Sequence, residues 1–214
     1  MFGRSIALTL AAALGVALAP SASEAQGWNA KFGGLPGRDY IQAELGYSNV
    51  PKVAYMFGIS NNLSIGPAFA FDLGYYQTRG TQPGLGFSAP IRFGLLRSGN
   101  KSLGLTFEPG LALSFPQFGD TGIALLLNVG GNFGVEVAPN VTIGGGVDLP
   151  IALGLSPGFA FIMPILFGPV IEYRAIDDLS ILFDMKLGPH VTFGDGGSAV
   201  VFGLKLAAGI AYRF

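Results

Sequence analysis

Residues 200–214 read VVFGLKLAAGIAYRF, and this stretch decides the fold. Every second residue from Val200 to Phe214 is apolar, and the residues between them are mostly small or charged. Successive side chains of a β-strand point to opposite faces, so the segment predicts a strand with one apolar and one small or polar face. A strand that has lipid on one side and a lumen on the other shows this pattern.

Earlier segments repeat the period of two, most clearly residues 179–193, where Asp184, Lys186 and His190 share one face. The other predicted strands are residues 39–47, 52–60, 63–76, 84–97, 102–115, 122–137, 141–155 and 159–174. The sequence therefore predicts an all-β fold, a closed antiparallel up-and-down transmembrane β-barrel over residues 39–214. We expect about ten strands, with eight or twelve as the alternatives.

The connections between these segments alternate in length. Short turn sequences occupy residues 61–62, 98–100, 139–140 and 177–178, and longer connections occupy residues 78–83, 116–121 and 194–198. In outer-membrane barrels the short turns face the periplasm and the longer loops face outward. We expect the same orientation for this chain.

Composition supports a barrel. Half of the chain is hydrophobic and only 12% is charged, about half the charged share of a soluble domain. The 34 Gly and 14 Pro residues disfavour helices, and a closed barrel is the other way to satisfy a backbone in lipid. The net charge of −1 gives no indication of a nucleic-acid partner. With no Cys, thiol catalysis and thiolate metal sites are excluded.

The N-terminal region predicts export. Arg4 precedes an unbroken run of small and apolar residues over positions 6–19, and Ser23 and Ala25 are suitable for cleavage. This run of about 14 residues is shorter than the roughly 20 that a spanning helix needs, so residues 1–25 are interpreted as a cleaved secretory signal peptide. We expect residues 26–38 to form a flexible periplasmic lead or a small plug.

The ending Ile210, Tyr212 and Phe214 resembles the terminal insertion signal of outer-membrane β-barrels of Gram-negative bacteria. The resemblance implies a bacterial outer-membrane location. It also implies that outer-membrane lipid is a partner, together with the barrel-insertion machinery and periplasmic chaperones during biogenesis. No motif identifies a subfamily, and the oligomeric state stays open.

Polar residues on the inner faces form the candidate site. The lumen or constriction candidates are Asp72, Arg92, Glu108, Asp148, Asp184, Lys186, His190 and Lys205. Ten strands enclose little more room than eight, which side chains fill, and charges in such a space must be paired. The charges therefore predict either a plug of salt bridges that closes the pore or a narrow conduit with a charged wall.

A catalytic role has little support in the sequence. His190 shares a face with Thr192 and Asp184, but six residues of strand place Asp184 roughly 20 Å from His190. Nothing indicates a metal or another cofactor, because His and Cys do not cluster. We therefore expect that the chain is not an enzyme.

Prolines within the predicted strands are the least expected feature. Pro67, Pro109, Pro150 and Pro189 recur every 39 to 42 residues, about one hairpin apart. Each proline removes one donor from a strand ladder. The prolines are interpreted as bulges or bends in a repeated hairpin, or alternatively as gaps through which a ligand leaves sideways.

The leading functional hypothesis is a porin-like narrow channel for small or partly hydrophobic solutes. Apolar inner residues such as Leu126, Leu166 and Leu182 leave room for such a cargo. The alternative is a non-conducting structural barrel of the envelope. A lipid-modifying outer-membrane enzyme that uses His190 is the third possibility.

Overall fold

The computed structural model describes residues 29–33, 37–47, 49–72, 83–115, 121–156, 158–195 and 197–214. The predicted signal peptide, Trp28 and most of the predicted outer loops lie outside these residues. No helix among the described residues is long and apolar enough to cross a membrane.

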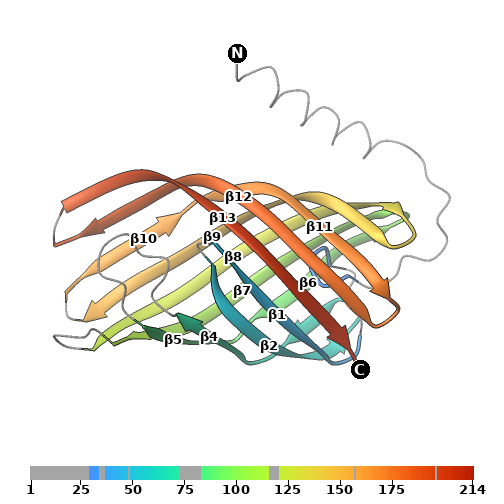
Figure 1. Cartoon of the computed structure of the whole chain (residues 1–214), viewed down its shortest axis with the longest axis horizontal. Helices are drawn as coiled ribbons and strands as arrows, with labels where there is room; N and C mark the ends of the chain where they lie inside the picture. Colours follow the sequence, from blue (N-terminus) through green and yellow to red (C-terminus); the bar gives the residue numbers. More distant parts are fainter. Residues whose placement is uncertain are drawn as a thin grey trace, which may run out of the picture.

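Thirteen antiparallel segments form one sheet. They are β1 (Tyr40–Tyr47), β2 (Asn49–Ser60), β3 (Leu63–Ile65), β4 (Ala68–Asp72), β5 (Gly84–Ser88), β6 (Ile91–Ser98), β7 (Lys101–Ser114), β8 (Gly122–Ala138), β9 (Val141–Ser156), β10 (Ala160–Pro164), β11 (Leu166–Ile176), β12 (Leu179–Gly194) and β13 (Gly197–Arg213). The first strand, β1, pairs with β2 and also with β13, which closes the sheet into a barrel (Figure 1).

Three pairs of segments are interrupted parts of single wall strands: β3 with β4, β5 with β6, and β10 with β11. Leu63 pairs with Phe93, and Ala68 pairs with Ser88. The same number of residues separates these two pairs along each of the two strands. The register is therefore continuous across the break. Counting each interrupted pair once, the described residues form ten wall strands, which confirms the predicted barrel and its strand number.

The first two interruptions, β3/β4 and β5/β6, coincide with prolines that keep one of their two ladder bonds. The carbonyl of Pro67 accepts a hydrogen bond from the Tyr55 amide at 3.0 Å, and the carbonyl of Pro90 accepts one from Gly66 at 3.2 Å. Only the amide donor is missing at these positions. Because the register does not shift at Pro67, this proline does not mark a bulge, and of the two interpretations, a bulge or a bend, only the bend remains there.

The turns at one end of the barrel match the prediction, but the longer connection predicted at residues 194–198 is not found, because Gly194 of β12 pairs with Gly197 of β13 and leaves two residues between the strands. Two-residue turns at residues 61–62, 99–100, 139–140 and 177–178 lie at one end, here called the turn end, where the C-terminus also lies (Figure 1). The opposite end, here called the loop end, carries the connections whose described parts include residues 158–159.

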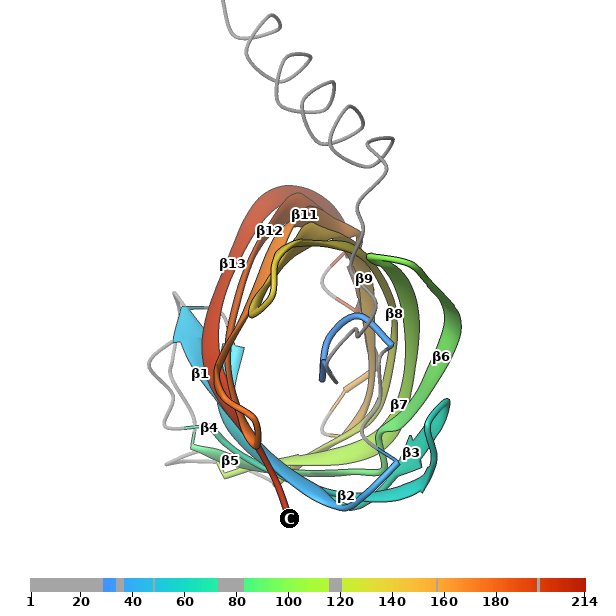
Figure 2. The same ribbon diagram turned by 90° about the vertical axis from the view of Figure 1, so that its right-hand side faces the viewer.

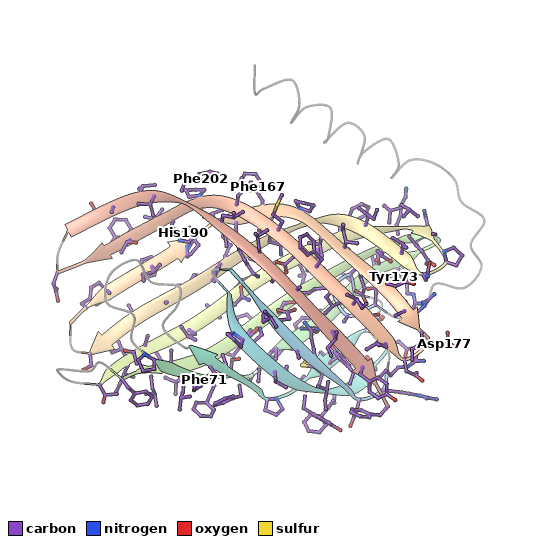
Figure 3. All side chains as sticks on the ribbon, in the orientation of Figure 1. Phe71, Phe167, Tyr173, Asp177, His190 and Phe202 are labelled. Atoms are coloured by element: carbon purple, nitrogen blue, oxygen red, sulfur yellow. The ribbon has the colours of Figure 1, made fainter. Side chains whose placement is uncertain are left out.

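Side chains divide between an apolar outer face and a largely polar inner face. Phe71, Phe167 and Phe202 are exposed on the outside of the wall (Figure 3). Exposed Ile210, Tyr212 and Phe214 follow each other along the outer face of β13 and beyond its end. An apolar band of this kind is the surface that a barrel presents to lipid.

A charge on this outer face should be most costly at the middle of a strand. Phe107 lies on the outer face near the centre of β7, whereas Val137 lies beside the turn that ends β8. We expect Phe107→Arg to lower the free energy of unfolding from a bilayer by about 2–4 kcal/mol, and Val137→Arg by about 0–1 kcal/mol. Equal losses in denaturant titrations of the two variants would contradict this placement of the wall in the membrane.

Candidate functional site

A short stretch of chain that precedes the first strand lies inside the barrel. Residues 29–33, here called the plug segment, are enclosed by the ring of strands (Figure 2). The amides of Ala30 and Lys31 donate to the two carboxylate oxygens of Glu172, at 2.8 and 3.0 Å. In turn, Arg92 donates to the carbonyl of Ala30 at 3.0 Å, and Asn132 donates to the carbonyl of Lys31 at 3.1 Å. Inner-wall side chains therefore hold the backbone of the plug segment.

The side chain of Lys31 adds a charged contact to these hydrogen bonds. Its ammonium forms ion pairs with Glu44 and, at 3.2 Å, with Asp184. Burial by itself would lower the pKa of Lys31, but the carboxylates of Glu44 and Asp184 outweigh burial and raise the pKa. Lys31 is therefore held as a cation between β1 and β12.

Wall glycines make room for the plug segment. A Cβ atom on Gly134 would overlap the ring of Phe32, and one on Gly104 would collide with the backbone of Gly33. Gly33 itself has a φ of 87°, which favours glycine. Phe32 is fully buried against this wall. For residues 26–38 we expected a flexible periplasmic lead or a small plug. Residues 29–33 have the second arrangement.

A second group of charges lies beside the plug segment on the inner wall. Asp148 pairs with Lys186 at 2.9 Å and with Lys205 at 3.0 Å, and Lys205 also approaches Asp184 at 3.8 Å. Lys186 donates to the side-chain oxygen of Asn132 at 3.2 Å. Lys186 is only 2% exposed, so its charge depends on these partners rather than on water.

The opposite wall carries a smaller polar cluster. Lys52 forms an ion pair with Glu108 at 3.0 Å, and the hydroxyl of Ser88 donates to the same carboxylate at 2.6 Å. Arg92 donates to the hydroxyl of Tyr40 at 3.1 Å and also binds Gln42. On this side of the lumen the charges of Lys52 and Glu108 therefore compensate each other, and Arg92 donates to neutral oxygens.

A cavity of about 310 Å³ remains inside the barrel, and these charged side chains line part of it. Lys31 and Ala30 of the plug segment form part of its boundary. The rest of its wall is neutral, with small, apolar and amide side chains. These neutral lining residues include Ala70, Ser88, Leu126, Asn128, Pro150, Ala152, Pro164, Leu166 and His190.

Most of the predicted lumen residues meet around this cavity. Those that line it are Arg92, Glu108, Asp148, Asp184, Lys186, His190 and Lys205. The backbone of Asp72 pairs with Gly84, but the Asp72 side chain lies outside the described part of the structure. Sequence reasoning missed Lys31, Lys52, Asn128 and Asn132. A period of two could have indicated the last three, whereas Lys31 precedes the strands and follows no such period.

The residues considered for catalysis are not brought together. Asp184 binds Lys31 and Lys205. The Nε2 atom of His190 is buried without a hydrogen-bond partner among the described residues. Within the same part of the chain, His, Asp and Glu side chains do not form a group of three that could hold a metal ion.

Comparison with solved structures finds the outer membrane protease OmpT of Escherichia coli, at 12% sequence identity and a TM-score of 0.45. The match covers 82% of this chain and 93% of OmpT. No family model matches the sequence, and a search of curated proteins gives no match.

This comparison corrects one expectation from the sequence. We expected that the chain is not an enzyme, yet a protein with which it shares this barrel-level similarity is a protease. The exclusion of enzymatic activity therefore does not stand. Similarity at this level transfers neither an activity nor a catalytic residue to this chain.

The ion pairs of Asp148 offer a test of how far the lumen depends on charge compensation. Asp148→Asn leaves Lys186 and Lys205 without their shared counter-ion, so we expect a loss of about 3–5 kcal/mol in unfolding free energy. The half-exposed pair Asp178–Arg213 is the control, and Asp178→Asn should cost at most about 1 kcal/mol. Denaturant unfolding in detergent micelles measures both losses, and similar values would show that the inner pairs are solvated.

Proposed function

We propose that this protein is a porin-like narrow channel of the bacterial outer membrane, for small uncharged or partly hydrophobic solutes. The solute occupies the lumen cavity, and the plug segment closes the turn end, which faces the periplasm. Residues 1–25 direct export as a cleaved signal peptide. The insertion machinery reads Ile210, Tyr212 and Phe214, which are exposed along one outer face of the barrel.

The observation that carries this proposal is the unfilled cavity of about 310 Å³ above the plug segment. A lumen designed only for rigidity would be filled with side chains, as small barrels are. Here Leu126, Leu166 and Ala152 give the cavity an apolar wall, and Asn128 and His190 add polar groups. Binding sites for small molecules combine an apolar lining with a few polar groups in this way.

The plug segment has the properties of a gate because it is not part of the wall. Its backbone bonds go to the side chains of Glu172, Arg92 and Asn132 rather than to a neighbouring strand. It can therefore leave the lumen without breaking any ladder bond. Its main charged anchor is Lys31, whose two carboxylate partners belong to the wall.

A non-conducting structural barrel is the second candidate. The paired charges around Asp148 and Glu108 favour it, because compensated ion pairs resist the entry of water and ions. The two candidates differ in whether removal of the plug segment opens a continuous path.

Reversing the charge at Lys31 tests the channel. Lys31→Glu places a third carboxylate beside Glu44 and Asp184, and like charges in a desolvated site repel each other. We expect frequent, larger conductance steps from Lys31→Glu in planar bilayers, compared with rare or small steps from the wild type. Lys31→Arg keeps the charge and should behave like the wild type.

A second variant displaces the plug segment without changing a charge. Gly104→Ala puts a methyl group where the backbone of Gly33 lies, so it should raise conductance in the same direction as Lys31→Glu. If both variants insert and fold but stay silent, the channel is refuted and the structural barrel is favoured.

A further inference from the structure

The wall has an interruption between β9 and the strand formed by β10 and β11. Residues 160–162 pair with β9, and pairing resumes at Leu166, which is opposite Asp148. No pair joins residues 163–165 to residues 149–151, although the register is the same on both sides of the gap. That register places Pro150 directly opposite Pro164.

Both ladder bonds at this position are missing. The amide of Ile165 donates to Pro189 of β12 at 2.9 Å. Because neighbouring residues of a strand direct their backbone groups to opposite sides, the backbone of Pro164 is directed toward β9. Pro150 and Pro164 would then exchange two hydrogen bonds, but neither has an amide hydrogen.

The flanking bonded pairs are Asp148–Leu166 and Ala152–Ile162. They are four residues apart, or roughly 13 Å along the strand, which is twice the normal spacing. We call residues 149–151 and 163–165 the proline seam. Pro67, Pro90, Pro109 and Pro189 differ from it, because each has a carbonyl that accepts an amide of the adjacent strand.

The lumen side of the seam is a row of side chains across the wall. Asn128 pairs in register with Pro150, and Pro164 pairs with His190. The four residues therefore follow one another on adjacent strands, and all four line the cavity. Oδ1 of Asn128 and Nε2 of His190 are both buried without a hydrogen-bond partner among the described residues. One unsatisfied polar atom thus lies on each side of the seam.

The lipid side of the seam is apolar. Leu149 and Ile151 of β9 alternate with the inward Pro150, and Met163 and Ile165 alternate with the inward Pro164. Ile151 also borders the cavity. Ile165 is exposed on this face. A molecule that crosses here meets hydrocarbon outside and the neutral part of the cavity inside.

We propose that the proline seam is a lateral portal between the lumen cavity and the membrane. The molecules that pass are uncharged and largely apolar and carry a hydroxyl group. A hydroxyl can donate to Oδ1 of Asn128 and either donate to or accept from the His190 imidazole. The strands can separate locally without breaking a ladder bond, because the seam has none. This proposal rests on the proposed function, since the cavity must hold a solute.

A disulfide across the seam should close the portal. Leu149 and Ile165 are directly opposite in register on the lipid side, in a non-bonded pair whose Cα separation of about 4.5 Å suits a disulfide. The chain has no cysteine of its own. The matched control is Val129→Cys with Leu149→Cys, which joins Leu149 to its partner on β8, where the wall is paired.

Two photoreactive probes separate the portal from the cavity. The first is a phospholipid with a diazirine on one acyl chain, which cannot leave the bilayer. The second is a water-soluble trifluoromethyl-diazirinyl benzyl alcohol, which reaches the cavity through an open end. In proteoliposomes of the full mature chain, mass spectrometry locates the labelled peptides that contain Asn128 and His190.

We expect the phospholipid to label these peptides in the wild type and in the control. Labelling should fall to background in oxidised Leu149→Cys/Ile165→Cys and return on reduction. If the benzyl alcohol labels the row but phospholipid labelling is absent or unaffected by the disulfide, the portal is refuted and the cavity stands. If neither probe labels the row in any folded variant, both the portal and the solute-binding cavity are refuted.

The hydroxyl preference has its own test. Asn128→Leu combined with His190→Leu removes both polar partners from the row but keeps its bulk. The double variant should lose the preference for the benzyl alcohol probe over the analogue without the hydroxyl. An unchanged ratio of labelling by the two probes would refute this assignment of the ligand class.

Discussion

Every backbone donor and acceptor in the wall must find its partner within the protein, because lipid offers none. The pairing of β1 with both β2 and β13 meets this requirement by closing the sheet. The same requirement explains how the wall tolerates prolines. At Pro67, Pro90, Pro109 and Pro189 the carbonyl stays bonded, so the cost is one unpaired acceptor on the adjacent strand. Where Pro150 and Pro164 meet, the ladder loses both bonds together.

Inside the barrel, the pairing of opposite charges determines how the polar side chains are arranged. The ion pairs of Asp148, Asp184 and Glu108 form one part of the lumen wall, and the rest of the cavity wall is neutral. Lys31 belongs to this ionic part although it is not on a strand. The plug segment therefore completes the charge balance of the lumen as well as narrowing it.

Much of this arrangement could be predicted from the sequence. Alternation along residues 179–193 and 200–214 indicates which side chains face inward, and the cavity in the structure is lined by Asp184, Lys186, His190 and Lys205. Alternation cannot say which inward residues meet, because that depends on the register between strands. The position of Pro150 opposite Pro164 depends on this register, so the sequence alone could not predict it. The plug segment has no periodic pattern, and its position depends on side chains from several distant strands.

The contacts of the plug segment also set an order of assembly. Ala30 binds Glu172, which is 142 residues further along the chain, and Lys31 binds Asp184, 153 residues away. Those partners face one another only after the late strands have joined the early ones. Closing contacts of such long range form late, because a large loop must first be ordered. When the sheet first closes, the lumen therefore does not yet contain the plug segment. Residues 29–33 are synthesised before the first strand but take their final position last.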